Sequence, residues 1–225
     1  MDFLDNQNDF IDFDVNWEDK PQIKHKMNKS SMHKRAVEDR ALKRFIKNEQ
    51  QTFNASRNLD SLAKRPKKNQ QYRLVTEKSF NAYALIKSVL STGQIEELYI
   101  AIYRINEPKV VSICNLIESG NIKKATFVVS NFFRETKKPE VWADKLATFC
   151  DEHRDVARIA FVHTHCKICL IHKNDDYYIL EGSGNMSDNA RIEQYIYENN
   201  EKAFNFHKEW MEDVVNKFKE KKVNK

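Results

Sequence analysis

Glycine is the strongest constraint on this backbone, because only four glycines occur in 225 residues and two of them share one tetrapeptide. That tetrapeptide, Gly182-Ser183-Gly184-Asn185, follows a strand-like segment that contains His165 and Lys167. Side chains two residues apart on a strand point to the same face. Glycine lets the backbone approach a ligand closely, while serine and asparagine donate hydrogen bonds to anionic oxygens. The pattern therefore predicts a phosphate-binding site.

Charge is distributed unevenly along the chain. Residues 1–20 carry seven acidic residues and one lysine, residues 21–73 carry fifteen basic and four acidic residues, and the remainder carries 22 of each. A basic surplus confined to one segment favours a polyanionic partner. The acidic leader, which alternates aspartate with aromatic residues, is expected to be disordered. It is alternatively an anchor for a partner protein, or a mask for the basic segment.

The chain begins without a positively charged, apolar leader, and its sequence contains no continuous apolar span. We therefore expect a cytoplasmic protein with no membrane partner. The four cysteines lie mostly in apolar segments without the spacing of a disulfide framework, which favours buried, reduced thiols. They are Cys114, Cys150, Cys166 and Cys169.

The basic segment has a helical pattern from Met32 to about Phe53. Its narrow apolar stripe consists of Val37, Ala41, Phe45 and Ile46. Such a helix either docks on the neighbouring domain or on a second copy, or it contacts nucleic acid. A basic linker with a helix-breaking proline follows at residues 64–68.

The pattern becomes regular beyond residue 74, where helices and strands alternate. Helices are expected over Phe80–Leu90, Glu107–Ile117, Pro139–Cys150 and Ala203–Phe218. Strands are expected over Leu98–Tyr103, Ala125–Ser130, Ala157–His163, His165–His172, Tyr177–Glu181 and Ile192–Tyr197. This alternation predicts an α/β fold, a mixed β-sheet flanked by helices on both faces. We thus divide the chain into an acidic leader (1–20), a basic helical appendage and linker (21–73) and this domain (74–225).

Three short motifs stand in a fixed order within about thirty residues. They are His165-x-Lys167, Gly182-Ser183-x-Asn185 and Glu193. In this order, and embedded in this strand pattern, they resemble the phospholipase D superfamily in its single-motif, nuclease-like form. The resemblance covers residues 79–215, and it implies a phospholipase D-like fold for this region.

The resemblance also implies phosphodiester cleavage through a covalent phosphohistidine, without a metal or other cofactor. His165 is then the nucleophile or its protonated counterpart, and Lys167 neutralises the phosphate oxygens. Ser183 and Asn185 donate hydrogen bonds to the same group, and Glu193 orients the imidazole. The cycle needs one neutral and one protonated histidine, but the sequence has a single His-x-Lys motif. A homodimer is therefore expected.

The chain departs from the family pattern at one position. The family usually has an aspartate five residues after the lysine, where this chain has His172. Asp175 and Asp176 lie nearby but out of register, and the loop to Gly182 is about three residues longer than usual. This departure favours an alternative in which the domain has lost catalysis and binds or scaffolds nucleic acid.

A metal site is a second alternative, because His163, His165, Cys166, Cys169 and His172 crowd ten residues. A Cys-x-x-Cys pair on a β-strand, however, points its two sulfur atoms to opposite faces, whereas a zinc knuckle needs a turn. His165 and Lys167 on their own also fit the edge of a strand with no catalytic role.

The expected function is a nucleic-acid phosphodiesterase, an endonuclease with little sequence preference. DNA is favoured over RNA as its partner, although the sequence does not decide between them. A phospholipid phosphodiesterase is less favoured, because no segment combines basic residues with a broad aromatic face. Tyr195, Tyr197 and Arg134 either line the groove near the site or serve core packing and surface solvation.

Overall fold

The computed structural model describes residues 40–45, 51–55, 65–77, 82–135, 140–187 and 192–223. All of them belong to one compact unit, residues 37–225. The acidic leader and most of the basic segment between residues 21 and 64 lie outside the described residues.

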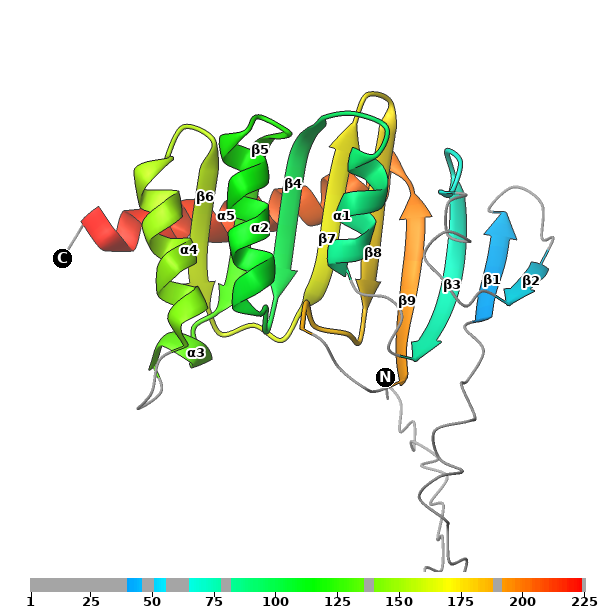
Figure 1. Ribbon diagram of the computed structural model, residues 1–225, viewed down its shortest axis with the longest axis horizontal. Helices are drawn as coiled ribbons and strands as arrows, with labels where there is room; N and C mark the ends of the chain where they lie inside the picture. The colour runs from blue at the N-terminus through cyan, green and yellow to red at the C-terminus, as the bar shows by residue number, and fades with distance from the viewer. Residues whose placement is uncertain are drawn as a thin grey trace, which may run out of the picture. The chain divides into compact units, whose positions relative to one another are not determined.

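In this part of the chain, nine strands form one mixed sheet (Figure 1). In spatial order they are β2 (Gln51–Ala55), β1 (Arg40–Phe45), β3 (Gln70–Glu77), β9 (Ile192–Asn199), β8 (Asp176–Gly182), β7 (Lys167–Lys173), β4 (Ile95–Ile102), β5 (Ile122–Ser130) and β6 (Ala157–Val162). Strands β4, β5 and β6 are parallel, and all other neighbours pair antiparallel.

Helices cover both faces of this sheet (Figure 1). Helices α1 (Ala82–Leu90), α2 (Glu107–Glu118) and α4 (Val141–Glu152) pack on one face, and α5 (Glu201–Val223) packs on the other. A short helix, α3 (Phe132–Glu135), precedes α4. The predicted mixed sheet with helices on both faces is therefore confirmed. Among the described residues, no helix has both the length and the apolar character needed to cross a membrane.

The core has two parts, one on each face of the sheet, because side chains along a strand alternate between the faces. Strand β4 shows this most clearly. Leu98, Ile100 and Ile102 pack toward α1, α2 and α4. Tyr99 and Ala101 pack toward α5. Strands buried on both faces have nearly continuous apolar sequences, as parallel strands require. The same physics explains why β4, β5 and β6 were readily predicted from sequence.

The helix expected from Met32 to Phe53 is wrong where the chain is described. Strands β1 and β2 pair with each other, and β1 also pairs with β3. A narrow stripe of four apolar residues gives a helix little surface to bury, whereas the edge of β3 offers a ladder of backbone hydrogen bonds. The sheet also begins earlier than expected, because β3 spans the boundary drawn at residue 74.

Several strands end or begin at one edge of the sheet, where ligands of α/β proteins usually bind. The carboxyl ends of β4, β5 and β6 meet there, together with the start of β7 and the end of β8 (Figure 1). Ligands of α/β sheets bind outside the carboxyl ends of parallel strands. All of the predicted site residues follow or begin strands at this edge.

Phe127 tests the core on the α2 side of β5, where its side chain is 1% exposed. We expect Phe127→Ala to lower the free energy of unfolding by about 3–5 kcal/mol, because it removes a large ring and leaves a cavity. Urea denaturation measures this loss. Phe206→Ala makes the same change at a ring that is 65% exposed, and should shift stability by less than about 0.5 kcal/mol. Equal losses in the two variants contradict the assigned core.

Candidate active site

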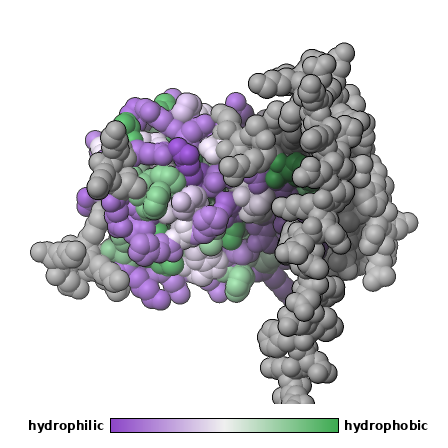
Figure 2. Space-filling model, turned by 90° about the horizontal axis from the view of Figure 1, so that it is seen from below, coloured by the Kyte–Doolittle hydropathy of each residue, from purple (hydrophilic) through white to green (hydrophobic). Residues whose placement is uncertain are grey.

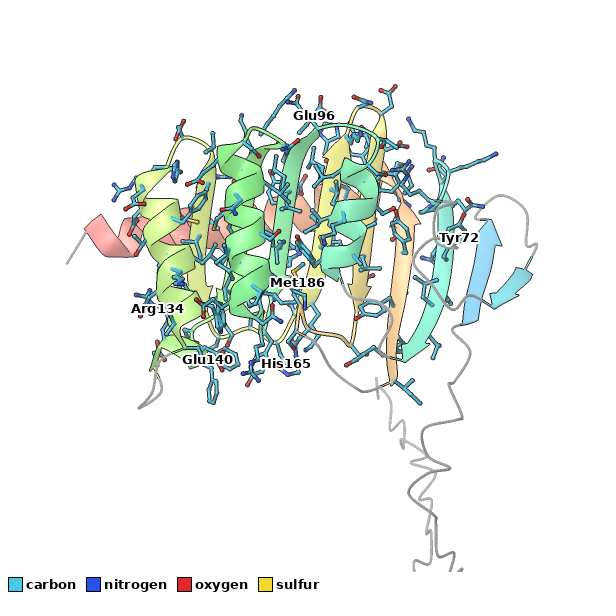
Figure 3. All side chains as sticks on the ribbon, in the orientation of Figure 1. Tyr72, Glu96, Arg134, Glu140, His165 and Met186 are labelled. Atoms are coloured by element: carbon cyan, nitrogen blue, oxygen red, sulfur yellow. The ribbon has the colours of Figure 1, made fainter. Side chains whose placement is uncertain are left out.

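His165 lies in the loop before β7, which begins at Lys167. The expectation that both residues share a strand is therefore wrong. The loop after β6 turns sharply, with the Cys166 amide donating to the Thr164 hydroxyl at 3.2 Å. This turn leaves His165 exposed at the edge of the sheet, while β7 holds Lys167 partly buried. Figure 3 shows His165 at this edge.

Lys167 nevertheless reaches the histidine. Its Nζ lies 3.1 Å from His165 Nδ1 and 2.9 Å from the His165 carbonyl oxygen. An ammonium group donates and cannot accept, so Nδ1 accepts this hydrogen bond. A neutral His165 ring therefore carries its proton on Nε2, on the side away from Lys167.

The environment of Lys167 makes its ammonium form less stable than that of an exposed lysine. Burial lowers the pKa of Lys167, and the nearby negative charge of Glu193 acts in the opposite direction. The ammonium also lies 5.7 Å from the centre of the Tyr103 ring. A partly desolvated cation beside an exposed imidazole can gain much from an incoming anion.

The glycines of the tetrapeptide have a structural role that differs from the expected one. A Cβ atom on Gly182 would overlap the Gln194 carbonyl oxygen, and one on Gly184 would overlap the Tyr195 hydroxyl. Both glycines therefore let the turn pack directly against β9. The close approach they permit is to the protein's own strand.

Ser183 is bound to β9 at three points. Its amide donates to the Gln194 carbonyl at 3.0 Å, and its hydroxyl accepts from the Gln194 amide at 3.0 Å. The hydroxyl donates to the Glu193 carboxylate. Glu193 therefore contacts Ser183, and makes no hydrogen bond to His165 among the described residues. Its charge acts on Lys167 instead.

Asn185 connects this turn to the loop after β4. Its Oδ1 accepts from the Arg104 amide at 3.2 Å. The next residue, Met186, pairs with Ile105 in an isolated parallel bridge. Asn185 therefore orders the edge of the sheet, and within the described residues its amide nitrogen keeps both donors unused.

A pocket of about 570 Å³ opens beside His165 and Lys167. It extends across β8 and β9 to β3, whose Arg73 lies at its far wall. The lining side chains and backbone come from Arg73, Leu74, Val75, His165, Cys166, Lys167, Ile168, Glu181, Gly182, Gln194, Tyr195 and Ile196. This mixture of polar and apolar groups is typical of small-ligand sites, and the volume is within their usual range.

His172 lies far from this site, at the other end of β7. Its Nε2 is 2.9 Å from the Asn174 carbonyl oxygen and 3.5 Å from the Glu96 carboxylate. Figure 3 shows Glu96 at the edge opposite His165. Asp176 is at the same far end, where its carboxylate accepts from Tyr178 and Asn199. The departure from the family pattern therefore lies outside the site.

The cysteine pair considered for zinc is divided by the sheet. Cys169 belongs to the core beneath α1, α2 and α4, and Cys166 packs against the α5 core. Their sulfur atoms therefore face opposite sides, as the strand pattern predicted. All four cysteines are free thiols, and burial raises the pKa of Cys114 to about 11.

Other residues named from the sequence have structural positions. Tyr195 and Tyr197 are buried in the core, where desolvation raises the pKa of each hydroxyl. Arg134 lies over the Phe161 ring and pairs with Asp144 at 3.3 Å. Tyr197 and Arg134 serve packing and surface pairing, whereas Tyr195 packs in the core and also lines the pocket beside His165.

Tyr103 is a site residue that the sequence motifs did not indicate. It follows β4, and its ring centre lies 4.6 Å from that of His165. More than sixty residues separate the two in sequence. Its position directly after a buried strand, at the edge where ligands bind, was the one available signal.

No protein-family model and no curated protein sequence matches the chain. Solved structures with a similar arrangement include a phospholipase D family member, Nuc, from Salmonella typhimurium, at 14% identity and a TM-score of 0.48. That alignment covers 65% of this chain and 95% of Nuc. Phosphatidylserine synthase from Haemophilus influenzae aligns at 17% identity and a TM-score of 0.48, over 76% of this chain and 42% of the synthase.

The packing of the turn on β9 yields one test. We expect Gly184→Ala to lower the free energy of unfolding by about 1–3 kcal/mol, because the new methyl group collides with Tyr195. Adding Tyr195→Phe removes the hydroxyl and should recover part of this loss, although the ring carbon Cζ at 2.8 Å still crowds the methyl group. Urea denaturation of both single variants and the double variant measures the coupling. If the loss of stability in the double variant equals the sum of the losses in the two single variants, the contact between Gly184 and Tyr195 is contradicted.

Lys167 yields a test of its environment. Its pKa should lie below the ordinary value of 10.5, because burial disfavours the ammonium form. An anion in the site favours that form, so tungstate should raise the pKa of Lys167, and tungstate affinity should fall as the pH rises through the unliganded value. Carbon-13 NMR of the lysine Cε atoms measures both, with Lys167→Met assigning the signal.

Lys173 is the internal control, because burial lowers its pKa too, but it lies at the far end of β7. Its titration should not respond to tungstate. If the pKa of Lys167 does not change when tungstate is added, or equals that of exposed lysines, the proposed anion site is contradicted.

Proposed function

We propose that this chain is a metal-independent phosphodiesterase that cleaves nucleic acid through a phosphohistidine, as a homodimeric endonuclease. The observation that carries the proposal is the 3.1 Å contact between Lys167 Nζ and His165 Nδ1, at an exposed sheet edge beside a pocket. This contact pairs a potential nucleophile with a partly desolvated cation, the two groups that attack on a phosphodiester needs.

The first step begins when a phosphate draws the Lys167 ammonium away from His165. The freed Nδ1 lone pair then attacks phosphorus, forming a P–N bond while the P–O bond to the leaving alcohol breaks. The imidazole keeps its Nε2 proton, so the phosphohistidine ring is cationic, and the leaving oxygen takes a proton from a second, protonated histidine. Lys167 neutralises the non-bridging oxygens, and we assign the Asn185 amide donors to the same oxygens.

The second step returns the enzyme to its starting state. The second histidine, now neutral, takes a proton from water, and the resulting hydroxide attacks phosphorus. The P–N bond breaks, so that one diester and one water become one monoester and one alcohol. The sequence offers one His-x-Lys motif per chain, and we assign the second histidine to His165 of another copy. This assignment makes the active unit a homodimer.

Nucleic acid is the proposed substrate because of the basic segment, residues 21–73, with fifteen Lys and Arg against four acidic residues. Phosphate contacts from such a segment supply affinity without sequence preference, and the charge alone fits DNA or RNA. We favour DNA. Binding should weaken with salt, with a log–log slope near ~0.9 per neutralised phosphate on duplex DNA.

A catalytically inactive nucleic-acid-binding or scaffold protein is the second candidate. The observation that favours it is the bond from Ser183 to Glu193, because no other carboxylate in the described part of the chain orients the His165 ring. A phospholipid phosphodiesterase is the third candidate, and turnover of phospholipid vesicles would identify it.

Nicking of supercoiled plasmid in EDTA tests the proposal. The full-length chain should convert plasmid to the open circular form, and His165→Ala should be slower by ~10⁴-fold or more, because it removes the nucleophile. Sedimentation velocity should give twice the mass of one chain. A phosphohistidine should be trapped by acid-labile ³²P labelling in wild type only.

His153→Ala provides the matched control, since His153 ends α4 at the opposite edge of the sheet. It should nick plasmid at the wild-type rate. If the wild-type chain binds DNA but does not nick it, the result supports the scaffold candidate. A chain that is monomeric and still active refutes the two-histidine scheme.

A further inference from the structure

The rings of His165, Tyr103 and Phe132 form a row that leads outward from the candidate nucleophile. The Tyr103 ring lies 4.6 Å from His165 and stacks on Phe132 with a ring-centre distance of 6.2 Å and an interplanar angle of 28°. Phe133 supports both rings from beneath, at 5.1 Å from Tyr103 and 5.2 Å from Phe132. The row ends at Phe132, whose side chain is 53% exposed, while Phe133 is buried.

The backbone fixes Phe132 in this outward position. The Asn131 amide donates to the Val162 carbonyl at 3.0 Å, and the Phe132 amide donates to the Ser130 hydroxyl at 3.3 Å. Just before α4, the Glu140 amide donates to the Phe133 carbonyl at 2.9 Å. Because β5 and β6 anchor α3 in this way, the exposed ring is presented by a rigid element and not by a free loop.

Cations flank the row. Lys167 lies 5.7 Å from the Tyr103 ring centre, and the Arg104 guanidinium lies 5.5 Å from the Phe133 ring centre. Arg104 also pairs with Glu140 at 2.8 Å while its side chain stays half exposed. Figure 2 looks onto this edge, where apolar patches alternate with hydrophilic surface and do not merge into one broad apolar area. Such a surface suits an amphipathic, anionic ligand better than a lipid bilayer or a large apolar interface.

We propose that Tyr103 and Phe132, named here the aromatic platform, stack an unpaired nucleobase of the nucleotide whose phosphate lies at His165 and Lys167. The inference rests on the proposed function and names its substrate class, single-stranded nucleic acid. A flat ring beside a phosphate-binding cation matches the covalent arrangement of a nucleotide, which joins a planar base to an anionic phosphate. Bases stack on aromatic side chains with little sequence preference.

Single-strand selectivity follows from the geometry of stacking. A paired base in a duplex already stacks on its neighbours, and must unstack before its face can meet Phe132. An unpaired base does so without that cost. The chain should therefore bind and cleave single strands, loops and ends in preference to continuous duplex.

The experiment compares three fluorescently labelled ligands that bind to full-length protein, measured by anisotropy. They are a 20-nucleotide oligothymidylate, an abasic backbone of equal length, and a duplex. Every protein in this comparison also carries His165→Ala, so that no ligand is cleaved during the measurement. Phe132→Ala should weaken binding of oligothymidylate by ~5- to ~100-fold, the range measured for loss of one stacked base, and should leave abasic binding unchanged. Phe132→Tyr, which keeps the ring, should retain wild-type affinity.

Phe206→Ala is the matched control, because it removes another exposed phenylalanine, 65% exposed against 53% for Phe132, from α5. It should leave all three affinities unchanged. Equal loss on oligothymidylate and abasic backbone, or no loss on either, overturns the proposal. Dissociation of the dimer by Phe132→Ala, seen by sedimentation, also overturns it, because the ring then belongs to an interface between copies.

Cleavage of the abasic backbone separates this proposal from the proposed function. This ester offers phosphodiester bonds without any aromatic ring, so Phe132→Ala should cleave it at the wild-type rate. Failure of wild type on this ester and on every nucleic acid refutes the proposed function, whereas a hydrolytically active enzyme with no base-dependent binding refutes the aromatic platform alone.

Discussion

The contact between the Lys167 ammonium and His165 is the interaction on which the site depends. It places a partly desolvated cation 3.1 Å from an exposed imidazole, and in doing so decides which ring nitrogen holds the proton. Without an anion, the ammonium satisfies its donors on the histidine itself. A phosphate would offer stronger, charge-assisted bonds, so ligand binding and release of the imidazole lone pair are coupled.

The sheet supplies the rigidity that this contact needs. Strands β4, β5 and β7 are buried on both faces, so their ends are fixed by the packing of two cores. The site stands where these ends meet, and the turn at Gly182 and Gly184 closes it by packing on β9. A glycine pair that appears from sequence to serve a ligand thus serves the scaffold first.

Local signals predicted most of the helices and strands after residue 74. Helix α2 begins where Pro108 and the Asn106 cap require, and its predicted and observed bounds differ by one residue at the end. The region before residue 70 was not predictable in the same way. Its basic stripe suggested a helix, yet β1 is ordered by pairing with β3, a partner about thirty residues away in sequence.

The sequence by itself determined which chemical groups are present and in what order, because motif spacing and strand alternation are local properties. It predicted Lys167 on a strand of an α/β sheet and Ser183 and Asn185 in a later turn, but it wrongly placed His165 on the same strand as Lys167. Only the tertiary structure decided their partners, since these contacts join segments far apart in the chain. In the folded chain Glu193 contacts Ser183, and His172 lies at the opposite edge of the sheet. Tyr103 lies beside His165, and Phe132 stacks on Tyr103.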